Sequence, residues 1–358
     1  MYLCADILDN RDNMDKTRKN TMRKRIGKYI AVLLVAGIML TIGGSFYMLD
    51  YSLSPDAERA DTARCFRELF KTCPKTRPWV DSLRRHHALR DTFVTMPTGE
   101  RHHALFIDRA SRKTALILHG WRDCSIDFLY LARIYERELG CNVVLPDLHA
   151  HGLSEGEMIQ MGWKDRDDAL RWLTLFQTDT MVVHGVSMGG ATAMMMSAMT
   201  FPKGIRDIRF VDDCGYTSVW EEFAGELKNQ FGLPEFPLMF STSLLCKIRE
   251  GWSFGEASAI KEVSKSTYPM LFIHGSDDTF VPTEMVQRLY DAKPSRKSIW
   301  ITRGCGHAES YTKYKAEYSK RLREFMGWSQ HKKTTGRTIV LPVAVSGCYF
   351  VRNMIIMR

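Results

Sequence analysis

The hydrophobic pattern of the chain changes character at two places. Residues 29–49 form one apolar run without a charge, whereas residues 50–88 are mostly polar and charged. From residue 91 onward, short runs rich in β-branched residues alternate with longer segments whose apolar positions recur every three or four residues. The short runs predict buried strands and the longer segments predict amphipathic helices. We therefore expect one apolar helix, a polar stalk or linker over residues 50–88, helical or irregular, and then an alternating α/β domain.

Continuous β-branched strands between helices are typical of a mostly parallel sheet with helices on both faces. A turn at Thr98-Gly99 joins the first two predicted strands. The strands are predicted at 92–97, 104–108, 113–118, 141–146, 180–186, 208–212, 270–274 and 298–302, and the helices at 126–139, 165–176, 188–200, 283–292 and 309–325.

The segment 216–264 is too long for a simple connection, so we interpret it as an inserted helical lid. It carries twelve Leu, Met, Phe and Trp residues between positions 223 and 254, more than one buried face of a helical pair requires. We expect the surplus to line a pocket for an apolar acyl or aromatic group. The alternative is that these side chains form the lid's own core. Pro234 and Pro237 separate the two predicted lid helices and form a hinge region.

The uncharged run 29–49 is long enough for a membrane-spanning helix, because about 20 residues at roughly 1.5 Å each cross the hydrocarbon layer. Residues 1–28 carry eight basic and four acidic side chains, and few basic residues follow the run. The positive-inside rule then predicts a single-pass anchor with a cytoplasmic N-terminus and an extracytoplasmic (periplasmic) domain. The alternative is a cleaved signal peptide, for which Gly43-Gly44-Ser45 offers a weak cleavage site.

The net charge of +9 resides in the two ends of the chain. Residues 1–28 and 329–358 are basic, and the body between residues 50 and 328 is neutral. A neutral body lacks the broad positive face that nucleic-acid binding needs, so we expect no nucleic-acid partner; basic ends suit anionic lipid. The tail 329–358 is basic and apolar without a predicted role, and the oligomeric state is not predicted.

None of the nine cysteines forms a CxxC pair, so a zinc site is not expected. Cys65 and Cys73 are close enough in sequence to bridge in an oxidising compartment, and the alternative is buried thiols. The adjacent pairs His86-His87 and His102-His103 lack ligand spacing, so we interpret them as surface or strand residues. The sequence also lacks a P-loop or a dinucleotide fingerprint, so no cofactor or metal is predicted.

The segment Gly185-Val186-Ser187-Met188-Gly189 lies between a predicted buried strand and a helix of small residues. This is the context of a nucleophile elbow, a turn so tight that the flanking residues must be nearly free of side chains. Gly185 and Gly189 meet that need, and the turn places Ser187 at a helix N-terminus. Ser187 is therefore the candidate nucleophile.

A serine nucleophile requires a base and an orienting carboxylate, and both candidates follow it in the chain. Asp278 lies in the loop after strand 270–274, and His307 in the glycine-rich loop after strand 298–302. Parallel strands deliver these loops to one edge of the sheet. Asp277 is the neighbouring alternative for the acid, and Asp212 or Asp213 is a second one. His119, His274, His151 and His184 are interpreted as structural.

An oxyanion hole needs two backbone N–H groups. We expect one from Met188, directly after the nucleophile, and the other from Trp121, in the loop after strand 113–118.

These motifs resemble those of the α/β-hydrolase superfamily over about residues 90–327, and within it those of the bacterial membrane-anchored hydrolases described as serine-aminopeptidase-like or BEM46-like. The resemblance implies an α/β-hydrolase fold with nucleophile Ser187, acid Asp278 and base His307. The residues that carry it are LHGW (118–121), PDLHAHGLSEG (146–156), MGWKDRDDALRW (161–172), VHGVSMGGAT (183–192), DDCGYTSVWEEF (212–223), FIHGSDDTFVP (272–282) and GCGHAES (304–310).

The sequence thus predicts a hydrolase domain over 89–328 on an N-terminal anchor. The expected activity is cleavage of a carboxylic ester or related acyl bond in a small molecule. A serine peptidase acting on amides is the alternative, because this fold hosts many substrates. An alternative of another class is a catalytically silent hydrolase fold that serves as a binding protein.

Overall fold

The computed structural model describes the backbone of residues 2–328 and the side chains of residues 18–328. The predicted tail 329–358 lies outside the described residues. The first element, α1 (Tyr2–Leu53), contains the uncharged run 29–49. Its segment Arg18–Leu53 is long and apolar enough to cross a membrane, and the side chains along its apolar run are largely exposed.

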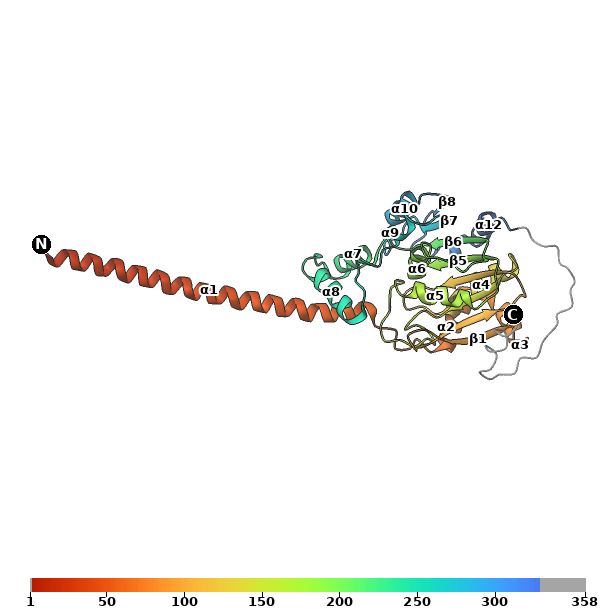
Figure 1. The fold of residues 1–358 in the computed structure, drawn as a ribbon, viewed down its shortest axis with the longest axis horizontal. Coiled ribbons are helices and arrows are strands. Elements are labelled where there is room, and N and C mark those ends of the chain that lie inside the picture. Colours follow the sequence, from red (N-terminus) through yellow and green to blue (C-terminus); the bar gives the residue numbers. More distant parts are fainter. Residues whose placement is uncertain (1, 329–358) are drawn as a thin grey trace. The chain divides into compact units, whose positions relative to one another are not determined.

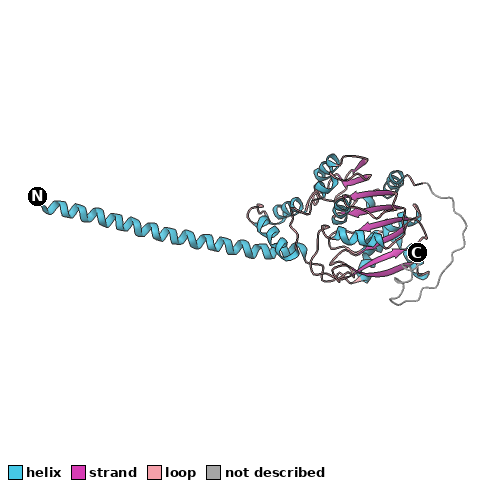
Figure 2. Cartoon of the chain, viewed as in Figure 1, coloured by secondary structure: helices cyan, strands magenta, loops and turns pink. Residues whose placement is uncertain are grey.

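One eight-stranded sheet, in the order β1-β2-β4-β3-β5-β6-β7-β8, forms the centre of the domain (Figure 2). The pairs β1–β2 and β2–β4 are antiparallel, and the remaining neighbours are parallel. This arrangement confirms the predicted mostly parallel sheet. The strands are β1 (Leu89–Thr95), β2 (Arg101–Ile107), β3 (Lys113–Leu118), β4 (Asn142–Pro146), β5 (Thr180–Val186), β6 (Asp207–Asp213), β7 (Met270–Gly275) and β8 (Lys297–Thr302).

Helices cover both faces of the sheet, which explains why the central strands read as continuous apolar runs. In β3, Leu116 and Leu118 belong to one core and Ala115 and Ile117 to the other. The first core lies under α5 (Asp165–Thr174), α6 (Met188–Met196), α9 (Ala259–Val263) and α10 (Thr283–Ala292), and the second under α4 (Leu129–Arg137), α11 (Ser310–Lys313) and α12 (Lys315–Met326). In place of the single closing helix expected at 309–325, the structure has two helices, α11 and α12. The helix expected at 126–139 begins with a short 3-10 helix, η2 (Ser125–Phe128).

The segment 50–88 is helical, one of the two forms expected, but it packs on the domain rather than forming a separate stalk or linker. It contains α2 (Thr62–Thr72), the short η1 (Pro74–Thr76) and α3 (Arg77–Arg85). Leu69, Trp79 and Leu83 are buried in the second core, and the Trp79 indole donates a hydrogen bond to Glu136 at 3.1 Å. Only one narrow face of each helix is apolar, which is why composition alone suggested a linker.

The predicted lid consists of α7 (Val219–Phe231), α8 (Leu238–Glu250) and α9, all between β6 and β7. Ser218 caps α7 by accepting a hydrogen bond from the Glu221 N–H, and Gly232 ends the helix in a left-handed conformation. Helix α8 packs against α1 rather than on the sheet, as Figure 1 shows.

Candidate active site

Ser187 lies in the turn between β5 and α6 with φ 56° and ψ −120°, a strained conformation for a residue with a side chain. The turn has no room for side chains at its flanking glycines. A Cβ on Gly185 would lie 1.9 Å from the Gly189 carbonyl oxygen, and one on Gly189 would lie 2.1 Å from the Leu118 carbonyl oxygen. The strand, the tight turn and the helix together have the geometry of a nucleophile elbow.

Ser187, His307 and Asp278 form one chain of hydrogen bonds. The Asp278 carboxylate lies 2.8 Å from His307 Nδ1, and His307 Nε2 lies 2.8 Å from Ser187 Oγ. Because the carboxylate accepts, Nδ1 carries the proton, and Nε2 is then free to accept the proton of the serine hydroxyl. The structure therefore brings together the three residues that the sequence predicted from distant segments.

The Asp278 carboxylate is held by its own loop. It is 5% exposed, and its Oδ1 accepts hydrogen bonds from the Phe280 and Val281 N–H groups at 3.0 Å. Burial by itself would raise the pKa of Asp278, but hydrogen bonds with His274 and His307 outweigh it and lower that pKa to about 2. The carboxylate is thus ionised throughout the neutral range.

The other acids considered from the sequence do not hydrogen-bond His307. Asp277 is exposed and accepts a hydrogen bond from Ser276 Oγ. Asp212 accepts from the Gly215 N–H at 3.0 Å, and Asp213 from the Tyr318 hydroxyl at 2.7 Å. Burial raises the pKa of Asp212 to about 7 and that of Asp213 to about 6, as expected for acids enclosed in the core.

The histidines interpreted as structural make structural contacts. His274 Nε2–H donates to the Val281 carbonyl at 2.9 Å and so braces the turn that carries Asp278. His119 accepts from the Leu148 N–H, and His151 accepts from the Arg122 N–H. His184 is enclosed between the hydroxyls of Tyr135 and Tyr318.

The two residues predicted to supply the oxyanion donors line the cavity of Ser187. Met188 is the first residue of α6, so its N–H is one of those that a helix leaves without an intrahelical partner. Trp121 follows β3, and it lines the same cavity as Ser187 and Met188. The Trp121 indole donates a hydrogen bond to the Ser52 carbonyl in α1 at 3.0 Å.

This cavity, of about 110 Å³, has an unexpected wall. Of the apolar lid residues expected to line it, only Phe223 does so. Five others, Phe231 among them, line a smaller adjoining cavity, and five of the twelve are exposed. The end of α1 supplies Tyr51 and Ser52. The exposed lid residues are Phe231, Leu233, Phe236, Phe240 and Leu244.

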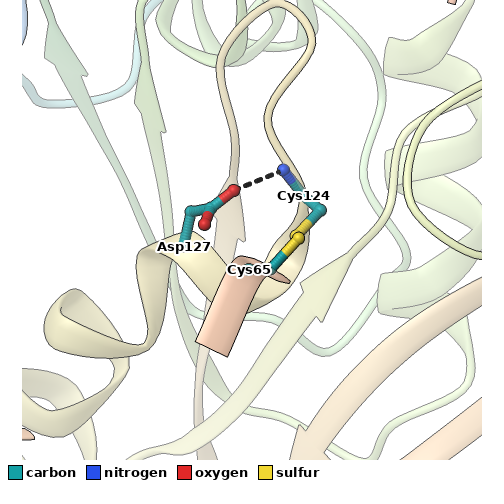
Figure 3. Close-up of side chains that lie close together, drawn as sticks. All are labelled: Cys65, Cys124 and Asp127. Carbon is teal, nitrogen blue, oxygen red and sulfur yellow. Dashed lines mark hydrogen bonds between the residues drawn. The ribbon is translucent and has the colours of Figure 1, made fainter. Parts of the chain in front are cut away.

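Among the residues whose side chains the structure describes, three groups place metal-type ligand atoms within 4.8 Å of one another. They are Cys65, Cys124 and Asp127; Glu100, His102 and His149; and Cys214, Asp278 and His307. The last group overlaps the hydrogen-bonded chain of Ser187. The second joins His102, which is buried in β2, to Glu100, two residues earlier, and to His149, which is remote in sequence. Sequence spacing does not find this group, because His149 approaches His102 only in the folded chain, where their ring centres lie 5.6 Å apart. The first group shows that Cys65 faces Cys124 and not Cys73 (Figure 3).

Comparison with known proteins identifies the family. Residues 115–316, more than half of the chain, match the profile described as the Alpha/beta hydrolase family. The chain belongs to the alpha/beta hydrolase family. This hydrolase is 31% identical over 218 residues to the "Uncharacterized protein YqkD" of Bacillus subtilis (strain 168), covering 60% of this chain and 70% of that protein.

A second relative comes from yeast. The "Uncharacterized membrane protein YNL320W" of Saccharomyces cerevisiae is 28% identical over 176 residues, which cover 47% of this hydrolase and 55% of the yeast protein. This hydrolase thus spans about half the length of that relative. The narrower resemblance to bacterial serine-aminopeptidase-like proteins stays a prediction.

Solved structures share the fold. The Pyrococcus furiosus esterase Pf2001 superposes with a TM-score of 0.54 at 24% identity, over 67% of this hydrolase and 92% of the esterase. A membrane phospholipase A, described as a bacterial virulence factor, superposes with a TM-score of 0.50 at 16% identity, over 72% and 92% of the two chains. At such identities the likeness concerns the fold alone.

Proposed function

We propose that this chain is a membrane-anchored serine hydrolase that cleaves carboxylic esters through an acyl-enzyme. The observation that carries the proposal is the hydrogen-bonded chain from Ser187 Oγ through His307 to Asp278. A serine with an adjacent base and a buried orienting carboxylate is the arrangement that activates a hydroxyl for attack on a carbonyl.

In the first half of the reaction, Ser187 Oγ attacks the ester carbonyl carbon while His307 Nε2 takes the hydroxyl proton. The oxyanion lies between the N–H groups of Met188 and Trp121. The bond to the leaving alcohol breaks, and His307 returns the proton to the alcohol oxygen. In the second half, a water attacks the acyl carbon in the same way, which releases the acid and restores Ser187. The ionised Asp278 holds the imidazole in the required tautomer throughout.

We propose further that α1 remains attached as a single-pass anchor with the N-terminus in the cytoplasm. The small residues Gly44 and Ser45 pack against the lid: a Cβ on Gly44 would lie 3.1 Å from Leu238 Cδ1, and Ser45 Oγ donates to Ser241 Oγ at 2.6 Å. Cleavage at this point would remove part of the lid's support. This packing supports an anchor over a cleaved signal peptide.

Labelling with a fluorophosphonate tests the proposal, since only an activated serine reacts. The wild-type chain should be labelled, and Ser187→Ala should not. Ser264→Ala, which removes an exposed hydroxyl in the lid segment, is the matched control and should be labelled like the wild type. A folded wild-type chain that is never labelled would favour the binding-protein alternative.

A further inference from the structure

The outer face of the lid is apolar. Phe240, Leu244 and Ile248 are 55%, 62% and 72% exposed, and their four-residue spacing places them in one stripe along α8. Phe236, 73% exposed, extends the stripe at its N-terminal end. Contiguous apolar patches on soluble proteins commonly mark a contact with another protein or with a membrane.

The position of α8 beside α1 indicates which contact this is. Ser241 hydrogen-bonds Ser45, and Arg249 lies 3.3 Å from the Asp50 carboxylate. Helix α8 therefore runs beside the last turns of the uncharged run 29–49 (Figure 1). Because a membrane-spanning helix holds its apolar run in the hydrocarbon layer, the stripe lies at the membrane surface.

The same end of α1 borders the cavity of Ser187. A second, smaller cavity is lined by Met48 and Phe231, and it shares Tyr51 and Phe223 with the first. The two cavities thus adjoin between α1 and the lid. An acyl chain that leaves the bilayer along α1 can follow the apolar side chains of the two cavities, such as Met48 and Phe223, to the nucleophile.

One wall of the site is polar. Glu222 is 4% exposed, it lines the cavity of Ser187, and neither of its carboxyl oxygens has a partner among residues 18–328. Glu226 and Gln230 line both cavities. Burial raises the pKa of Glu222 well above its usual value, which favours the neutral carboxyl, a group that donates as well as accepts hydrogen bonds. The described residues that line the two cavities include two carboxyl groups and no basic side chain, so they suit hydroxyl groups on the substrate and offer no positive charge to a phosphate.

We propose that the substrate is a bilayer-resident acyl ester with a neutral, hydroxyl-bearing polar part, of the acylglycerol class, which reaches Ser187 laterally between α1 and the lid while the apolar stripe of α8 lies in the membrane. This inference rests on the proposed serine hydrolase mechanism. Ser187 takes the acyl group, the proton passes through His307 to the glycerol oxygen, and water then releases the fatty acid.

The test compares two esters. The full chain in phosphatidylcholine vesicles is given monooleoylglycerol within the bilayer or p-nitrophenyl butyrate in solution. Phe240→Ser/Leu244→Ser/Ile248→Ser changes side chains that line neither cavity, and it should lower hydrolysis of monooleoylglycerol by about tenfold or more. The soluble ester should be hydrolysed within about twofold of the wild-type rate. Ile301→Ser, at an exposed apolar position of β8, is the matched control and should change neither rate.

The outcomes separate the two proposals. A wild-type chain that hydrolyses the soluble ester but not monooleoylglycerol, or a triple variant that loses both equally, overturns the membrane-lipid substrate. Faster cleavage of phosphatidylglycerol than of monooleoylglycerol overturns the claim that the polar part of the substrate is uncharged. Absence of fluorophosphonate labelling overturns the serine mechanism instead. In that case a fluorophore attached at Leu244→Cys still tests the membrane contact. Doxyl lipids should quench its fluorescence more than that of the same fluorophore at Lys203→Cys, an exposed position before β6.

A second observation, independent of the mechanism, concerns two cysteines. Cys65 in α2 and Cys124 before η2 direct their sulfur atoms toward one another, and Asp127 accepts a hydrogen bond from the Cys124 N–H at 3.0 Å (Figure 3). Both cysteines line a cavity of about 400 Å³ that also includes Arg64 and Arg122, so a small oxidant can enter. The contact with Cys124 lowers the pKa of the Cys65 thiol, which favours its thiolate.

We also propose that Cys65 and Cys124 form a disulfide in an oxidising compartment. Two S–H bonds are lost and one S–S bond forms. The two electrons and two protons reduce a disulfide oxidant such as glutathione disulfide to two thiols. The bond would tie α2 to the loop that carries Trp121.

Differential alkylation tests the bond on the full chain treated with glutathione disulfide under native conditions. A first alkylating reagent marks free thiols, and a second one marks thiols released by reduction. Cys65 and Cys124 should carry the second label in equal amounts, and reduction should lower the melting temperature by about 5 °C. Cys73→Ser should leave the pattern unchanged. The proposal is overturned if Cys65 and Cys124 both carry the first label, which marks free thiols, or if a peptide is found in which Cys65 is linked to Cys73.

Discussion

The indole N–H of Trp121 donates a hydrogen bond to the carbonyl oxygen of Ser52 at 3.0 Å. The next residue, Arg122, donates to the carbonyls of Tyr51 and Ser54 at 3.1–3.3 Å, and its guanidinium lies 4.2 Å from the centre of the Trp121 ring. The loop proposed to hold an oxyanion donor therefore also holds the end of α1. Helix α1 and the candidate site therefore form one structural unit.

This contact predicts that Trp121→Phe weakens both stability and activity. Loss of the indole donor should lower the free energy of unfolding by about 1 kcal/mol, measured by urea denaturation. Movement of the loop should lower kcat/KM for p-nitrophenyl butyrate by about three- to tenfold. Trp163→Phe, which also removes an indole that lies beside an arginine, is the control. Equal effects of the two changes would show that the contact with Ser52 is immaterial.

The acid is tested by a pair of neighbouring substitutions. Asp278→Asn should lower kcat by about 10²–10⁴-fold, because His307 loses the group that sets its tautomer and stabilises its charged form. Asp277→Asn, at an exposed position, should leave kcat close to the wild-type value. A larger loss of kcat in Asp277→Asn than in Asp278→Asn would show that Asp277, and not Asp278, is the acid.

The elbow glycines should tolerate no side chain. Gly185→Ala places a Cβ against backbone atoms that cannot move away, so we expect little folded protein, measured by soluble yield and thermal unfolding. Gly225→Ala is the matched change in a helix, with nothing within 4 Å of the added Cβ. It should raise stability by about 0.5–1 kcal/mol through helix propensity. A well-folded Gly185→Ala chain would contradict the steric account.

The contacts of His103 with two carboxylates predict that the folded protein loses stability in alkaline solution. Its two ring nitrogens lie 2.7 Å from Asp147 and 3.1 Å from Asp91. Burial would lower the pKa of His103, but the hydrogen bonds with these carboxylates outweigh it and raise the pKa to about 9, above the usual 6.5. The stabilisation is complete below pH 6.5 and is lost as the pH rises through about 9. The urea midpoint should therefore fall between pH 6 and pH 10, and His103→Gln should flatten this dependence.

The orientation of α1 predicts the behaviour of fusions. Alkaline phosphatase joined after residue 60 should be active, because the positive-inside rule places that point outside the cytoplasm. A reporter that functions only in the cytoplasm should be inactive at the same point. The opposite pattern would place the domain in the cytoplasm, and a shortened soluble product would reveal cleavage near Ser45.

Much of the architecture is encoded locally and could be predicted. Strands such as β5 are buried on both faces, so their apolar runs are visible in the sequence, and turns such as that at Gly185 demand residues without side chains. Because parallel strands present their carboxyl ends at one edge of the sheet, the order of Ser187, Asp278 and His307 was enough to predict that they meet.

The surroundings of the site depend on contacts between segments that are remote in sequence. Composition alone does not tell whether an apolar residue such as Leu244 points into a pocket or outward, since that depends on which face of α8 packs against α1. The approach of Cys65 to Cys124 depends on the packing of α2 against η2, whereas sequence spacing offered only Cys73 as a possible partner. The sequence by itself determined the fold and the candidate triad, because burial and turn geometry leave a local pattern. Only the tertiary structure decided what surrounds Ser187, because packing between helices that are distant in the chain leaves no local pattern in the sequence.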